Sequence, residues 1–179
     1  MSFSSTTFRQ GESANRFANT YSLPRQTREA IINPASTYTG VFTAGMPLKV
    51  VSYTSGRLIV DVSAQDDSQA QYFLAPELLN GKIAVNGVAP ASFAKGDKVA
   101  VFQTLGEKEY DFLYIVKTGV SVSALGNATY EVATNTVKTA GATDIVIGKF
   151  LQAGGAGGVV KVCIETAGLS VQPAITTLV

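Results

Sequence analysis

From Tyr38 onward the sequence is divided into short apolar runs that are separated by turn-forming residues. The runs Leu48–Tyr53 and Leu58–Val62 flank Thr54-Ser55-Gly56-Arg57, which predicts a β-hairpin. Further runs recur every 10 to 17 residues, with Gly, Asn, Asp or Pro between them: 82–88, 98–105, 110–117, 129–132, 145–151 and 159–165. Because a βαβ fold would need helical stretches between its strands, this spacing predicts an all-β fold, either an antiparallel β-sandwich or a β-barrel.

Two segments between these runs have a different character. One or two helical turns are expected around Gln69–Leu79, where Pro76 would end or kink a helix. Gly154–Gly158 is rich in glycine, as are loops that bind phosphate at the start of a helix. Because the β-branched run Val159–Val162 follows directly, we interpret the glycines as a hairpin turn rather than a ligand site.

The composition changes near Asn33-Pro34. Four of the five arginines lie before this point, whereas every lysine lies between Lys49 and Lys161. The first segment is polar, with scattered Phe and Tyr, and cannot bury enough apolar surface to fold alone. We therefore expect an extended N-terminal arm over residues 1–33 and a β-barrel or β-sandwich domain over residues 34–179.

The arm carries two kinds of side chain that suit contact with a partner protein. Its aromatic rings are isolated apolar anchors, and its guanidinium groups match the carboxylates of a partner. The residues expected to bind are Phe8, Arg9, Arg16, Phe17, Tyr21, Arg25 and Arg28. The alternative is a tail with no binding role.

The sequence lacks the usual residues of catalytic and metal sites. It has no His and a single Cys, Cys163, which excludes Ser-His-Asp and Cys-His arrangements and multi-thiolate metal sites. Carboxylates are concentrated only at Asp66-Asp67 and at Glu107, Glu109 and Asp111, without the spacing of a calcium loop. We expect no enzymatic activity, no cofactor and no metal, and we expect Cys163 to be an inert core residue.

The charge content also limits the partners. Hydrophobic residues make up 46% of the chain and charged residues 15%, below the usual quarter or so of a soluble domain. A low charge in so apolar a chain suggests that a partner covers part of its surface. The net charge of +1 argues against binding nucleic acid, and no apolar stretch is long enough to span a membrane or to form a signal peptide.

Two stretches resemble motifs of the capsid cement (decoration) proteins of tailed phages. Phe93–Val101 contains a G-D-x-V strand, and Ile147–Val162 has an I-G-x-x-L strand, a turn rich in Gly and Ala, and a V-x-V strand. The resemblance covers roughly residues 38–165 and does not include the arm. It implies a virion protein, assembled in the host cytoplasm, that binds the major capsid protein on the outside of the head, typically as a homotrimer.

Two other functions stay open. The chain can be another β-structured virion component, such as a tail or fibre-attachment module. A third class is an enzyme or a carbohydrate-binding domain, although the chain has no Trp and its tyrosines are dispersed.

Overall fold

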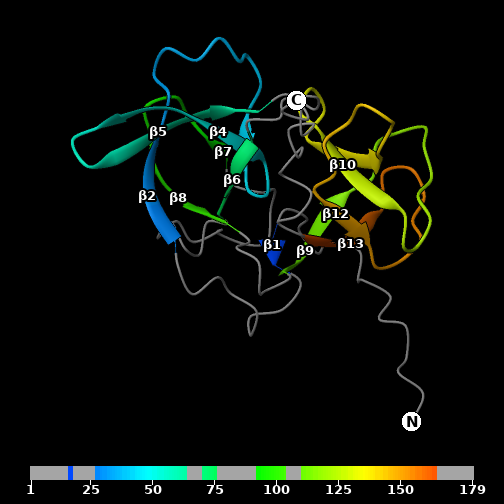
Figure 1. Cartoon of the computed structure of the whole chain (residues 1–179). Helices are drawn as coiled ribbons and strands as arrows, with labels where there is room; N and C mark the ends of the chain where they lie inside the picture. The colour runs from blue at the N-terminus through cyan, green and yellow to red at the C-terminus, as the bar shows by residue number, and fades with distance from the viewer. Residues whose placement is uncertain (1–15, 18–26, 64–69, 76–91, 104–109, 165–179) are drawn as a thin grey trace, which may run out of the picture.

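The computed structural model describes residues 16–17, 27–63, 70–75, 92–103 and 110–164, and the strands in this part form two main units and one short two-stranded sheet (Figure 1). All regular secondary structure of the described residues is β. The predicted all-β fold is therefore confirmed, and of the two expected architectures the structure contains a closed β-barrel.

The barrel unit has five strands in the order β2-β5-β4-β6-β8. These are β2 (Thr27–Ile32), β5 (Arg57–Val62), β4 (Pro47–Thr54), β6 (Ala70–Leu74) and β8 (Lys98–Phe102). The strand β2 closes the barrel because it pairs antiparallel with β8 on one side and parallel with β5 on the other. A β-bulge in β4 between Val50 and Ser52 lets the β4–β5 hairpin project at the left of Figure 1.

The sheet unit has six strands in the order β1-β9-β13-β12-β10-β11. These are β1 (Arg16–Phe17), β9 (Tyr110–Ile115), β13 (Val159–Ile164), β12 (Gly148–Phe150), β10 (Asn127–Glu131) and β11 (Thr136–Thr139). All its strand pairs are antiparallel. The sheet curls so that β11 returns to the residues that follow β9, since Val116 forms a bridge with Val137 and the N–H of Lys117 donates to the carbonyl of Val137.

One hydrophobic core runs through both units. Its fully buried large side chains include Leu48, Phe73 and Phe102 of the barrel unit and Phe112, Tyr130 and Phe150 of the sheet unit. Residues 33–46, which we call the crossover segment, connect β2 to β4 and contain β3 (Phe42–Thr43), which pairs with β7 (Ser92–Phe93). This segment contacts the sheet unit before the chain returns to the barrel.

Most of the predicted strands lie where the alternation placed them. The hairpin β4–β5 turns through Ser55 and Gly56, which both have positive φ as a tight two-residue turn requires. The strands β8, β9, β10, β12 and β13 lie within or beside the predicted runs. The strand expected at 82–88 lies outside the described residues.

The expected boundary at residue 33 is wrong for the six residues of β2. Ala30 and Ile32 are completely buried in the common core, and β2 is one of the strands of the barrel. The first half of β2, Thr27–Glu29, is exposed and polar, which hid the strand in a polar segment. An arm separate from the barrel can therefore extend only to residue 26.

The expected helical turns at Gln69–Leu79 are also wrong over β6. Residues 70–74 form a strand that pairs with β4 and with β8, and residues 76–79 lie outside the described part. Tyr72, Phe73 and Leu74 are all buried. Because β6 is covered on both faces, its sequence shows no alternation that would mark a strand.

Replacing Ile32 by Ala tests whether β2 is part of the core. The change leaves a cavity, so we expect the free energy of unfolding to fall by about 2–5 kcal/mol. Thr27→Ala, at the exposed start of the same strand, is the control and should change it by about 0.5 kcal/mol or less. Urea denaturation followed by circular dichroism measures both, and two equally small effects would remove β2 from the core.

Candidate functional site

The two units are joined by hydrogen bonds that three tyrosines make between the sheet unit and the crossover segment. Tyr114 of β9 donates its hydroxyl to the carbonyl of Gly45 at 2.9 Å, and this contact is buried. The hydroxyl oxygen of Tyr130 of β10 lies 3.0 Å from the hydroxyl oxygen of Thr43. At the outer end of the segment, Tyr38 donates to the carbonyl of Val132 at 3.0 Å. We call these three tyrosines and the residues they contact the tyrosine junction.

Burial fixes the chemistry of the junction. It raises the pKa of Tyr114 and of Tyr130 far above the ordinary value for a phenol, so both hydroxyls stay protonated well above neutral pH. Tyr130 donates to the side-chain oxygen of Asn135 at 3.2 Å, which leaves Thr43 as the donor in the contact between their hydroxyls. The rings of Tyr114 and Tyr130 pack edge to face at 5.8 Å.

Gly45 is the residue on which the two units meet. Its N–H donates to the carbonyl of Leu74 in the barrel unit, while its own carbonyl accepts from Tyr114 in the sheet unit. A Cβ at this position would lie 2.5 Å from the ring of Phe112 and 2.7 Å from that of Tyr114. Its φ of 81° also favours glycine. Both the close approach and the backbone conformation therefore require glycine here.

A cleft of about 640 Å³ opens beside the junction, between the two units. Its walls come from the barrel unit, from the crossover segment, and from the end of β10 with the turn that follows: Thr37, Tyr38, Lys49, Asp61, Val62, Glu131, Val132 and Ala133. Asp61 accepts hydrogen bonds from the side chains of Asn33 and Ser36 and from the N–H of Val62. This carboxylate holds the crossover segment in place, and its oxygens already accept hydrogen bonds from the chain itself.

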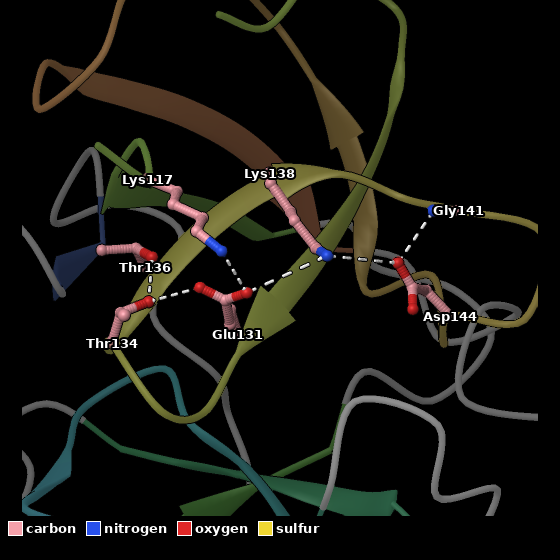
Figure 2. A network of polar contacts seen from close by, with 7 residues as sticks. All are labelled: Lys117, Glu131, Thr134, Thr136, Lys138, Gly141 and Asp144. Atoms are coloured by element: carbon pink, nitrogen blue, oxygen red, sulfur yellow. Dashed lines mark hydrogen bonds and ion pairs between the residues drawn. The ribbon is translucent and has the colours of Figure 1, made fainter. Parts of the chain in front are cut away.

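Glu131 is the centre of a second polar group, shown in Figure 2. One of its oxygens lies 2.6 Å from the ammonium of Lys117 and 3.9 Å from that of Lys138. The other oxygen accepts from the hydroxyl of Thr134 at 2.7 Å. Lys138 reaches on to Asp144 at 3.9 Å. The network ties the end of β9 to the β10–β11 hairpin, and so it supports the seam where the curled sheet closes.

The charges of this network suit a structural role. The hydrogen bond from Lys117 lowers the pKa of Glu131, whose side chain is only 15% exposed. Glu131 is therefore ionised at neutral pH and is a poor proton donor. Among the described residues, no group of three or more Cys, Asp or Glu side chains is arranged to hold a metal ion.

The structure separates the residues that the sequence predicts for partner binding. Phe8, Arg9, Tyr21 and Arg25 lie outside the described residues. Arg16 and Phe17 form β1, whose backbone pairs with Leu113 and Phe112 at the edge of β9. Arg28 is exposed on β2 of the barrel unit, opposite Val101. The sequence gives no sign that part of the arm pairs with the chain's own sheet.

The other sequence features lie at structural positions. The glycine-rich segment connects β12 to β13 as predicted, and the N–H groups of Gly154, Gly157 and Gly158 donate to carbonyls of the chain. Cys163 is buried on β13, as expected, and Asp111 lies opposite it on β9. Asp66, Asp67, Glu107 and Glu109 lie outside the described residues.

Sequence reasoning missed both the tyrosine junction and the Glu131 network. Tyr38 and Val132 are 94 residues apart, and no local pattern marks such a contact. For the network, the alternation of Thr136-Val137-Lys138-Thr139 was an available signal of a strand pairing with β10.

A comparison with models of protein families finds no match, and a comparison with curated proteins finds none either. The described residues contain no helix that is long and apolar enough to cross a membrane. The resemblance to capsid cement proteins thus stays a hypothesis that rests on the quoted motifs.

Glu131→Gln tests the electrostatic role of the network. Because the fold lowers the pKa of Glu131, the carboxylate stabilises the native state above its unfolded pKa of about 4.3, and this contribution is lost as the pH falls through the folded pKa. We expect the variant to be about 1 kcal/mol less stable at neutral pH and equal to the parent chain in strong acid. Urea denaturation over a pH series measures this, and a deficit that is independent of pH would contradict it.

Proposed function

We propose that this chain is a structural virion protein, a capsid cement or decoration protein that binds the outer surface of a phage head. It stabilises contacts between neighbouring major capsid subunits and self-associates as a trimer. The function is binding and not catalysis. Its partners are the major capsid protein and further copies of the chain.

The observation that carries the proposal is where the exposed apolar side chains lie. On the barrel unit, Val51 and Tyr53 stand on the outer half of β4, where Tyr53 is 63% exposed. On the sheet unit, Leu125 and Leu151 are exposed on turns. The shared core and the tyrosine junction join the two units into one body. A body of this kind suits bridging, because it presents apolar contacts on both units.

The two motifs that resemble those of capsid cement proteins support the proposal because one lies in the barrel unit and the other in the sheet unit. Lys95-Gly96-Asp97-Lys98 forms the turn into β8, where Gly96 has a φ of 84° and Asp97 accepts from the N–H of Ala94. Lys95 donates to the carbonyl of Ser36 in the crossover segment. The second motif is the β12–β13 hairpin of the sheet unit.

Sedimentation with isolated phage heads tests the proposed function. We expect saturable binding to heads of the phage that encodes the chain and none to its isolated tails. Tyr53→Ser should weaken binding about tenfold or more, since burying one aromatic side chain contributes about 1.5–3 kcal/mol. Binding to tails alone would instead favour the tail or fibre-attachment function, and binding to neither would reject the proposal.

Deleting residues 1–15 tests the role of the arm in the same assay. The deletion removes Phe8 and Arg9 but keeps every strand that the structure describes. We expect the thermal midpoint to stay unchanged and binding to heads to weaken, with salt reducing the binding of the full chain only in part. If the shortened chain binds as tightly as the full chain, this part of the arm has no binding role.

A further inference from the structure

Two buried side chains of the sheet unit lie on the face of the sheet that points away from the core. Side chains alternate between the two faces of a strand, and Phe112 and Val162 point into the core. Their neighbours Leu113 and Cys163 therefore point to the opposite face, and neither is a member of the hydrophobic core that runs through both units. Leu113 is nevertheless completely buried, and Cys163 is only 5% exposed. We call this side of β9 and β13 the outer face.

The neighbouring side chains of the outer face border these two residues. In the register of the sheet, Lys149 and Asp111 lie on either side of Cys163, and Lys161 lies beside Leu113. They belong to the same layer of side chains, and Lys149 is itself exposed. Small apolar clusters outside the main core of a domain are usually found under a long connecting segment. We therefore expect a further segment of the chain to lie over Leu113 and Cys163.

The segment 165–179 has the position and the composition that such a cover requires. It follows β13 directly, so it begins two residues after Cys163. Its part 166–179 has no charged side chain, and its apolar side chains include Leu169, Val171, Ile175 and Leu178. Fully extended, the segment could reach about 50 Å, whereas neighbouring strands lie about 4.8 Å apart. It is therefore long enough to turn back and cross both β13 and β9.

The charges of the outer face favour this segment over the N-terminal arm. The face carries two ammonium groups, those of Lys149 and Lys161, against the single carboxylate of Asp111. Residues 1–26 carry three arginines against one glutamate, so the arm would bring further positive charge to this face. Like charges that meet in a contact oppose it. The segment 165–179 brings one glutamate and no Lys or Arg.

We propose that the outer face is the docking surface of the chain's own segment 165–179, which packs its apolar side chains over Leu113 and Cys163. The segment is then a cover that separates an apolar strip of the sheet from water and from other proteins. This inference does not depend on the proposed function, because it concerns a contact within one chain. It does assign the attachment to a partner to other surfaces, such as the exposed end of the β4–β5 hairpin.

Thiol labelling tests the cover, because Cys163 is the only cysteine in the sequence. A chromogenic disulfide reagent should react slowly with the native full chain, since the reactivity of a thiol depends on its exposure. Deleting residues 166–179 should accelerate the reaction about tenfold or more. Deleting residues 1–15 is the matched control and should leave the rate unchanged. The rate in concentrated urea gives the value for a fully exposed thiol.

A peptide with the sequence of residues 165–179 distinguishes a lost cover from a loss of stability. Added to the chain that lacks 166–179, it should slow the labelling of Cys163 and reach saturation, whereas a peptide of scrambled sequence should not. The inference fails if the shortened chain reacts as slowly as the full chain, or if the added peptide gives no protection. Faster labelling only after deletion of residues 1–15 would make the arm the cover and would equally overturn the inference.

Discussion

The contact between Tyr114 and Gly45 is the interaction on which the rest of the structure depends. A buried hydroxyl of the sheet unit donates to a carbonyl of the crossover segment, and an unpaired buried hydroxyl would cost about 1–3 kcal/mol. Because the N–H of Gly45 also donates a hydrogen bond to the carbonyl of Leu74, the carbonyl of Gly45 is held against the barrel. The position of one residue therefore sets how the two units meet. Tyr38 and Tyr130 repeat the arrangement at other points of the same segment.

The other polar groups hold in place the segments that meet at the tyrosine junction. Asn33 and Ser36 bond to Asp61, which holds the start of the crossover segment against β5. Glu131, at the end of β10, holds the closure of the sheet unit next to the place where Tyr38 meets Val132. The charged groups beside the cleft thus orient backbone segments.

The sequence predicted the parts of the fold that depend on local pattern. The β4–β5 hairpin has a two-residue turn and alternating flanks, so it was recognisable from ten neighbouring residues or so. The strand β2 was not, because its polar first half faces solvent and its parallel partner β5 lies far along the chain. The arginines before residue 33 marked a change of composition, but this change does not coincide with the edge of the barrel. The candidate site was predicted least, since Tyr38, Tyr114 and Tyr130 come together only through tertiary packing.

The central claim is that the tyrosine junction makes the two units one cooperative body, and calorimetry of Gly45→Ala tests it most directly. Gly96→Ala is the matched control, because Gly96 has a similar φ of 84° but no atom within 4 Å of an added Cβ. The parent chain and Gly96→Ala should each unfold in one transition, the control at a midpoint a few degrees lower. Gly45→Ala should unfold at a much lower temperature and in two separate transitions, because its new Cβ pushes the rings of Phe112 and Tyr114 away from the crossover segment. Two transitions in the parent chain, or identical behaviour of the two variants, would contradict the account.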